Sequence, residues 1–301
     1  LPVLNIVRPV AGIVGERLAF VPSIGFLTFI TALVFHFLKN EPAKPGLSVL
    51  YKKPVLYLTF LIPVFLFYVW GRNASWKDEL TLFDHDASFL ERSAGANNLI
   101  ANKYSEMLYF ATPLYPKEVI VEKCWKHYNL AVQADSSVFS AINNAGVIAF
   151  RYMQKPELAL GYFKAALRIN PNFPQAYENL GDCYYQLKNY EGAVAAYKES
   201  IRQEPKQFNS HLRLATTLMD LRSYVEGAAV LEKANVLFPQ SFEINEMAGR
   251  CYYLSGNEEK AIQKLESAYH LKPDTGIAKM LAELYLKTGN KEGASHYTNL
   301  Q

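Results

Sequence analysis

A proline-closed segment recurs through the C-terminal half of this chain. Pro171, Pro205, Pro239 and Pro273 stand thirty-four residues apart each time. Two further columns keep the same phase, one of small residues and one of large apolar residues: Ala159, Ala193, Gly227 and Ala261, then Phe163, Tyr197, Leu231 and Leu265. A period of this length, kept by several columns, indicates that one supersecondary unit has been copied, which predicts a solenoid.

Within each copy the apolar residues follow the spacing of two helices. In the second copy, Tyr177, Leu180 and Tyr184 fit a first helix, and Ala193 and Tyr197 fit a second. A short polar turn separates the two, and the closing proline ends the second helix. Each copy is therefore predicted to be an antiparallel helix pair. Because one pair cannot bury its own apolar face, neighbouring pairs must stack.

Three more columns, which begin at Leu180, Gly181 and Tyr184, keep the same thirty-four-residue period. The full set of columns resembles the tetratricopeptide repeat. The resemblance implies an all-α fold in which helix pairs form a right-handed superhelix. Successive copies are expected at 139–173, 174–207, 208–241 and 242–273. A partial copy with a one-residue slip is expected at 274–301, and a divergent copy at 94–138, so that the repeat domain covers 94–301.

In tetratricopeptide arrays the first helix of each pair lines a groove that can hold a polypeptide. By resemblance of register, the predicted groove residues here are Asn143, Phe150, Gln175, Glu178, Asp182, Tyr185, Asn209, Leu212, Thr216, Met219, Glu246, Arg250 and Tyr253. The set mixes amides, aromatics and both signs of charge, and it lacks the clustered lysines that would hold an acidic tail. The expected partner is therefore a protein or peptide acceptor with exposed backbone.

The N-terminal third has a different composition from the repeats. Residues 21–38 and 54–70 are apolar runs in which, tyrosines apart, His36 is the one ionisable side chain, and each is about long enough to span a bilayer. Buried core helices are the alternative, although these are usually shorter and more interrupted. We predict two transmembrane helices in a membrane region of residues 1–71, followed by an amphipathic linker at 72–93.

The loop between these runs, residues 39–53, sets the expected orientation. It carries four lysines against the single acid Glu41. Short basic loops stay on the cytoplasmic side of a membrane. Residues 1–20 and the repeats are therefore predicted to be extracytoplasmic, in the periplasm or in the lumen of the secretory pathway.

A short polar segment, Glu16-Arg17, precedes the first run and is followed by Pro22-Ser23 and Gly25-Phe26. This segment, together with the linker around Trp76, resembles the transmembrane and tetratricopeptide-repeat proteins, which are similar to polytopic C-type glycosyltransferases. The resemblance implies transfer of a sugar, commonly mannose, from a polyprenyl phosphate carrier to a protein hydroxyl.

Arg17 would bind the carrier phosphate, because a guanidinium is a permanently charged, bidentate donor. Glu16 would orient Arg17 or bind sugar hydroxyls. Alternatively, the two side chains pair with other membrane helices and hold the bundle together. No further cofactor is expected beyond the polyprenyl-phosphate sugar donor.

Members of that family carry many more membrane helices and an essential acid in their first outer loop. The catalytic base, whose identity is unknown, would thus lie upstream in the same polypeptide, and upstream helices and membrane lipid would contact this chain. This fragment alone should be inactive. Two hypotheses follow: the extracytoplasmic, protein-binding arm of a membrane glycosyltransferase, or a membrane-anchored scaffold for protein–protein interaction without enzymatic activity.

Other classes of function find little support in the composition. The net charge is only +3, and charged residues of both signs are interspersed, so no nucleic-acid partner is predicted. Asp84-His85-Asp86 does not predict a metal site, because three adjacent side chains on a helix point in different directions. The three cysteines follow no metal-binding or redox spacing and are predicted to be buried.

Overall fold

The computed structural model describes residues 92–109 and 115–298. These residues form twelve α-helices and contain no strand. Among them no helix combines the length and the apolarity that a membrane crossing requires. The predicted transmembrane helices at 21–38 and 54–70, with Glu16 and Arg17, lie outside the described residues.

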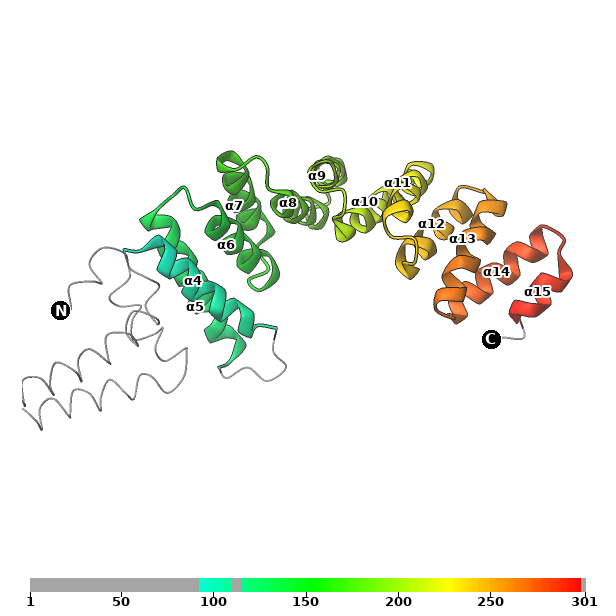
Figure 1. The fold of residues 1–301 in the computed structure, drawn as a ribbon, viewed down its shortest axis with the longest axis horizontal. Helices are drawn as coiled ribbons and strands as arrows, with labels where there is room; N and C mark the ends of the chain where they lie inside the picture. Colours follow the sequence, from blue (N-terminus) through cyan, green and yellow to red (C-terminus); the bar gives the residue numbers. More distant parts are fainter. Residues whose placement is uncertain (1–91, 110–114, 299–301) are drawn as a thin grey trace, which may run out of the picture. The chain divides into compact units, whose positions relative to one another are not determined.

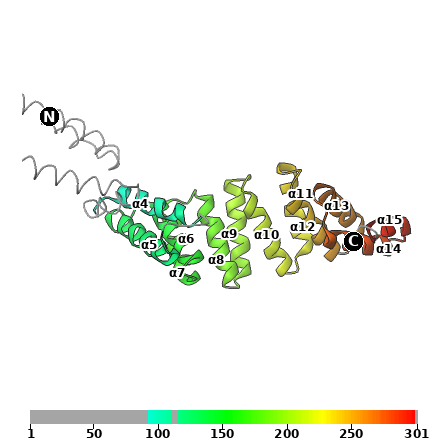
Figure 2. The same cartoon turned by 90° about the horizontal axis from the view of Figure 1, so that it is seen from below.

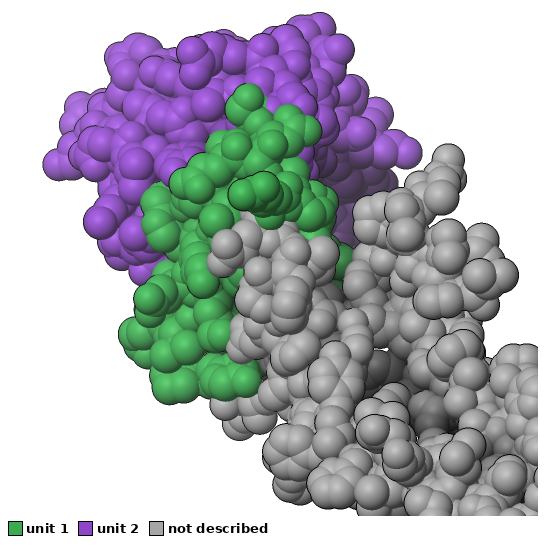
Figure 3. Space-filling model, turned by 90° about the vertical axis from the view of Figure 1, so that its left-hand side faces the viewer, with its two compact units in different colours: residues 1–136 green, residues 137–301 purple. Residues whose placement is uncertain are grey.

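The chain divides into two compact units, Leu1–Ser136 and Ser137–Gln301 (Figure 3). The described part of the first unit holds the helices α4 (Ala94–Met107) and α5 (Lys117–Ala134), which pack against each other. Their shared core is fully buried and includes Ile100, Ala101, Tyr104, Ile120, Cys124, Tyr128 and Ala131. The Tyr128 hydroxyl donates a hydrogen bond across the pair to Asn102 Oδ1 at 2.8 Å.

The second unit consists, in its described residues, of five consecutive helix pairs (Figures 1 and 2). The pairs are α6 (Phe139–Arg151) with α7 (Pro156–Ile169), α8 (Pro174–Gln186) with α9 (Tyr190–Gln203), α10 (Phe208–Asp220) with α11 (Tyr224–Leu237), α12 (Phe242–Leu254) with α13 (Glu258–Leu271), and α14 (Thr275–Lys287) with α15 (Lys291–Thr298). Each helix packs on the next along the chain. The prediction of an all-helical solenoid is confirmed for these residues.

Each pair turns at a residue with positive φ, and these residues carry the repeat period. They are Gln154 (φ 55°), Lys188 (φ 59°), Arg222 (φ 56°), Gly256 (φ 79°) and Gly289 (φ 80°). The spacing is thirty-four residues three times and then thirty-three. The last turn therefore comes one residue early, and α14 and α15 start correspondingly early. Because L side chains crowd the backbone at positive φ, Gly256 and Gly289 make this turn with less strain than Lys188 does.

The small-residue and large-residue columns explain how closely the helices of one pair approach. A Cβ atom on Gly181 would lie 2.5 Å from the Tyr197 ring, and one on Gly249 would lie 2.6 Å from Leu265. Tyr197 and Leu265 are themselves fully buried. The side chain of the second helix thus occupies the space that the first helix leaves empty, which fixes the packing of each pair.

The three cysteines are buried and free, as predicted. Burial raises the pKa of the Cys124 and Cys183 thiols to about 12 and that of Cys251 to about 11. Thiols with such pKa values remain protonated at neutral pH and act as small apolar side chains.

Candidate peptide-binding face

The first helices of successive pairs contact each other directly, from α6 to α8, from α8 to α10 and from α10 to α12. We call the side of these helices and of α14 that carries the predicted groove residues and their register neighbours the first-helix face; the Tyr253 hydroxyl of α12 reaches Glu283 of α14. All thirteen predicted groove residues belong to α6, α8, α10 or α12. Their distribution on this face is uneven, and the following contacts separate a polar part from an apolar part.

An asparagine ladder joins the first two pairs of the unit. Asn179 in α8 donates through Nδ2 to Asn143 Oδ1 in α6 at 3.2 Å. Asn143 in turn donates to Asn144 Oδ1 at 3.2 Å, and Asn143 itself is only 5% exposed. Asn143 therefore connects neighbouring helices.

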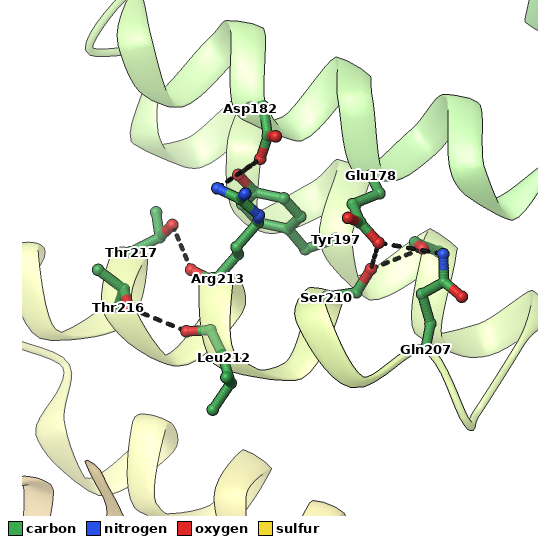
Figure 4. Close-up of polar contacts among 10 residues, drawn as sticks. Glu178, Asp182, Tyr197, Gln207, Ser210, Leu212, Arg213, Thr216 and Thr217 are labelled. Atoms are coloured by element: carbon green, nitrogen blue, oxygen red, sulfur yellow. Dashed lines mark hydrogen bonds and ion pairs between the residues drawn. The ribbon is translucent and has the colours of Figure 1, made fainter. Parts of the chain in front are cut away.

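Asp182 is the most deeply buried acid of the face, at 6% exposure. It accepts a hydrogen bond from the Tyr197 hydroxyl at 2.7 Å and forms an ion pair with Arg213 Nη1 of the next pair at 3.1 Å (Figure 4). Burial raises the pKa of Asp182, and this effect outweighs the lowering by Arg213 and Tyr197. The contacts link α8, α9 and α10 through one carboxylate.

Glu178 lies one turn before Asp182 and also reaches the next pair. Its Oε2 atom accepts hydrogen bonds from Ser210 Oγ and from Gln207 Nε2, each at 3.0 Å (Figure 4). Ser210 Oγ lies 2.9 Å from Ser200 Oγ, which donates to the Pro174 carbonyl at 3.0 Å. The hydroxyl chain thus continues from the face into the contact between α8, α9 and α10.

Two tyrosines on the face bind acids of the following pair. Tyr185 donates to Asp220 Oδ2 at 2.7 Å, and Tyr253 donates to Glu283 Oε1 at 2.9 Å. The hydrogen bond to Asp220, followed by burial, raises the pKa of Tyr185 to about 12. Both phenols therefore stay protonated at neutral pH and keep donating.

The remaining predicted groove residues differ in their accessibility. Arg250 forms an ion pair with Glu246 at 2.7 Å within α12. Gln175, Asn209 and Thr216 are exposed, whereas Phe150, Leu212 and Met219 are half-buried. The structure thus joins Asn143, Glu178, Asp182 and Tyr185 to neighbouring pairs in a polar part of the face, with Asn179 and Arg213 as their partners.

The face becomes apolar towards its C-terminal end. Leu212, Met219, Met247 and Met280 are half-buried and pack against the core of the last three pairs. Leu254 is 47% exposed and Leu286 is 64% exposed. We call these six residues the methionine part of the face.

Sequence reasoning missed Met247, Met280, Leu254 and Leu286. The register holds a signal for them, because Met247 and Met280 follow Arg213 at one and two repeat periods, counting the one-residue slip. Leu286 follows Tyr253 in the same way. These residues were missed because the predicted groove did not include the repeat positions of Arg213 and Asp220, and because it assigned no residue to the last, partial copy.

A polar hollow of about 370 Å³ lies elsewhere, between α11, α12 and α13. Its lining includes Asn235, Lys264, Ser267 and His270. Lys264 is held by Glu232 at 2.8 Å. Among the described residues no cluster of histidine, cysteine or acidic side chains could hold a metal ion.

Comparison with known proteins supports the repeat fold. Residues 145–208 and 212–275 match the sequence profile of the tetratricopeptide repeat. Two solved structures share the fold: YrrB, described as a tetratricopeptide-repeat protein with an unusual peptide-binding site, and pilF of Pseudomonas aeruginosa. YrrB is 19% identical with a TM-score of 0.53, and the match covers 65% of this chain and 94% of YrrB. For pilF the identity is 16%, the TM-score 0.53, and the coverage 68% and 88%.

Similar curated proteins include two human enzymes. Protein O-mannosyl-transferase TMTC3 is 24% identical over 248 residues, which is 78% of this chain and 25% of that protein. Protein O-mannosyl-transferase TMTC1 is 25% identical over 142 residues, or 47% of this chain and 16% of that protein. Superkiller protein 3 of Saccharomyces cerevisiae is 26% identical over 111 residues, or 35% and 8%.

The chain thus spans a quarter or less of the length of these relatives. It carries tetratricopeptide repeats with low-identity homology to protein O-mannosyl-transferases.

Proposed function

We propose that the repeats are the polypeptide-binding arm of a membrane glycosyltransferase, which transfers a sugar, mannose, from a polyprenyl phosphate carrier to hydroxyl groups of the bound protein. This proposal rests mainly on how much of the chain is similar to TMTC3. An alignment over 78% of the chain is longer than the whole segment 92–301, so it includes part of the first 91 residues. A likeness confined to the repeats would stop short of that segment.

The first-helix face supports the binding step. It runs along consecutive helix pairs, and it offers exposed amides at Gln175 and Asn209 beside half-buried apolar side chains such as Met219. A surface of this kind can hold polypeptide backbone through hydrogen bonds and side chains through apolar contact. Holding an acceptor near the reacting sugar raises its effective concentration there.

In this proposal the N-terminal segment supplies the contact with the carrier. Arg17 binds the lipid phosphate, and Glu16 orients Arg17 or binds sugar hydroxyls. The basic loop at residues 39–53 lies in the cytoplasm, so the repeats lie on the extracytoplasmic side together with the acceptor. The catalytic base belongs to another part of the same polypeptide.

The second candidate function is that of a membrane-anchored scaffold without enzymatic activity. The observation in its favour is that the repeats alone account for the likeness to YrrB and pilF, which are similar in fold only. The two candidates differ in what they require of Arg17. A membrane tether does not need a guanidinium at the membrane surface, whereas a site that binds a lipid phosphate needs its positive charge.

Carrier-dependent glycosylation separates the two candidates. The complete gene product would be expressed in cells that lack their own copy, and protein-linked mannose would be measured by mass spectrometry. We expect Arg17→Ala to abolish the product and Arg8→Ala, a matched change in the same N-terminal segment, to leave it unchanged. Equal products from the wild type and Arg17→Ala would remove Arg17 from the site, and no product from the wild type would favour the scaffold.

The orientation has a separate test. A cysteine introduced by Ser75→Cys should react with a membrane-impermeant thiol reagent in intact cells. A cysteine introduced by Ser48→Cys, in the basic loop, should react only after the membrane is permeabilised. The opposite pattern would place the repeats in the cytoplasm and would contradict transfer on the outer side.

A further inference from the structure

We infer that the methionine part of the first-helix face is where a partner protein binds, and that it takes an uncharged segment with large apolar side chains. The polar part of the same face acts instead as a brace between helix pairs. This inference rests on the proposed polypeptide binding and assigns it to particular residues. It keeps Leu212 and Met219 of the predicted groove, whose other residues are polar or aromatic, and adds four apolar residues to them.

The polar part is already occupied by its own contacts. Asp182 binds Tyr197 and Arg213, Glu178 binds Ser210 and Gln207, and these bonds join three helices. A ligand that took over the buried Asp182 carboxylate would have to break such bonds and leave charged groups unpaired. The polar part therefore stabilises the stack more readily than it binds a partner.

Polar contacts also occur near the methionine part, where Tyr253 of α12 donates to Glu283 of α14 and Arg250 pairs with Glu246. Among the described residues, however, no buried carboxylate joins the helices there as Asp182 does in the polar part. Met219, Met247 and Met280 come from three consecutive first helices and pack on one core while remaining partly accessible. Leu254 of α12 and Leu286 of α14 are 47% and 64% exposed. An unbranched thioether side chain adapts its shape to the group that it meets, so methionine-rich surfaces suit apolar ligands.

Two ion pairs border this part, and Glu283 on α14 accepts a hydrogen bond from Tyr253, so these charged groups already have partners. Arg250 pairs with Glu246 at 2.7 Å, and Lys287 pairs with Glu258 at 2.6 Å. Paired charges largely cancel each other's field and offer little attraction to a charged tail. The affinity must then come from apolar area, which favours an uncharged segment and predicts weak dependence on salt.

The experiment selects peptides from a phage-displayed library of random 16-residue sequences. The target is the full chain in lipid nanodiscs, so that no free detergent competes for the apolar surface. We expect the enriched peptides to be rich in leucine, phenylalanine and other large apolar residues. A chemically synthesised selected peptide, labelled with a fluorophore, then serves as the probe in affinity measurements.

The variants separate the two parts of the face. Met219→Glu and Met247→Glu should each weaken binding of the probe peptide by about tenfold or more, as a charge placed in an apolar contact does. Met219→Leu, which keeps the apolar surface, should bind within about threefold of the wild type. Val236→Glu changes an 81% exposed apolar residue on α11, a second helix, and should leave the affinity unchanged. Thermal unfolding of each variant confirms that it is folded.

The contrary outcomes are distinguishable. If the selected peptides are acidic or basic, or if Gln175→Glu and Asn209→Asp abolish binding while the methionine variants retain it, the face binds polypeptide through charged groups or exposed amides and this inference is wrong. If no peptide is enriched over empty nanodiscs, both this inference and the proposed polypeptide binding are contradicted. Loss of binding in Met219→Leu as well as in Met219→Glu would show that shape, and not apolarity, decides the contact.

Discussion

The junction between α8 and α10 and the junction between α10 and α12 have the same backbone plan but opposite chemistry on the first-helix face. In the first junction, Asp182 pairs with Arg213, and Tyr185 pairs with Asp220. One repeat later, the corresponding register positions hold Thr216 with Met247, and Met219 with Leu254. Two polar pairs are thus replaced by four residues of which three, Met219, Met247 and Leu254, are apolar.

This difference shows which positions of the repeat determine the fold. The pairs at the two ends of this stretch are packed alike inside, with Gly181 against Tyr197 in α8 and α9 and Gly249 against Leu265 in α12 and α13. Since these contacts set the approach of the helices, the positions on the outer face are free to differ. One stretch of the face can then brace the stack while the next binds a partner.

The largest expected effect tests whether the pairs α8–α9 and α12–α13 share this internal packing. Gly181→Val and Gly249→Val should each lower the free energy of unfolding by about 3 kcal/mol, because the added atoms meet Tyr197 or Leu265. Gly161→Val is the matched control, since nothing lies within 4 Å of its Cβ position, and it should change stability by less than about 0.5 kcal/mol. Chemical denaturation measures all three. A loss of stability at only one of the two buried glycines would show that the two helix pairs are packed differently.

The next effect concerns the brace itself. Tyr197→Phe removes the hydrogen bond to the buried Asp182 carboxylate and should lower the free energy of unfolding by about 2 kcal/mol. The counterpart in the methionine part, Met247→Leu, conserves volume and apolarity and should cost less than about 1.5 kcal/mol. The same denaturation experiment compares them. A larger loss in Met247→Leu than in Tyr197→Phe would mean that the polar part does not brace the stack.

A pH dependence should distinguish the two parts more finely. The pKa of Asp182 is raised in the folded protein, so the folded state binds a proton there more tightly than the unfolded state does. The contribution of this group is present below the unfolded pKa and is lost as the pH rises through the folded pKa. Relative to Asp182→Asn, the wild type should therefore lose stability as the pH rises from 4 to 7.

Met247→Leu is the control for this titration, because it changes no titratable group. Its stability relative to the wild type should be the same at every pH. Denaturation curves at pH 4, 5, 6 and 7 provide both comparisons. A relative stability of wild type over Asp182→Asn that rises with pH would indicate that the Arg213 pair, and not burial, dominates at Asp182.

The smallest expected effect compares the two exposed tyrosine links. Tyr185→Phe and Tyr253→Phe each remove one hydrogen bond to an acid of the next pair. Because these bonds lie near solvent, each change should cost about 0.5–1 kcal/mol. Chemical denaturation of the two variants measures the change in the free energy of unfolding. A decrease above about 2 kcal/mol for either variant would give that hydrogen bond a structural role equal to that of Tyr197.

The sequence predicted the features that repeat with the thirty-four-residue period. The helix pairs, the polar turns and the one-residue slip before Gly289 all follow from residues that recur in phase. The role of Asp182 could not be predicted in this way, because its partners Tyr197 and Arg213 belong to other helices and only their packing brings them within bonding distance. The repeat register places Met247 and Met280 at equivalent positions of successive copies. From the sequence alone, however, a half-buried methionine cannot be told from an ordinary core residue, because its exposure is not known.

Methyl NMR of the methionines tests the central claim most directly, that the apolar and not the polar part of the face receives the partner. The chain has five methionines, of which Met219, Met247 and Met280 lie on the methionine part. Met107 belongs to α4 and Met153 to the turn after α6, so these two are internal references. With carbon-13 in the methionine methyl groups and the selected peptide added, the signals of Met219, Met247 and Met280 should shift or broaden while those of Met107 and Met153 stay in place. Unchanged signals for all three, at saturating peptide, would contradict the account.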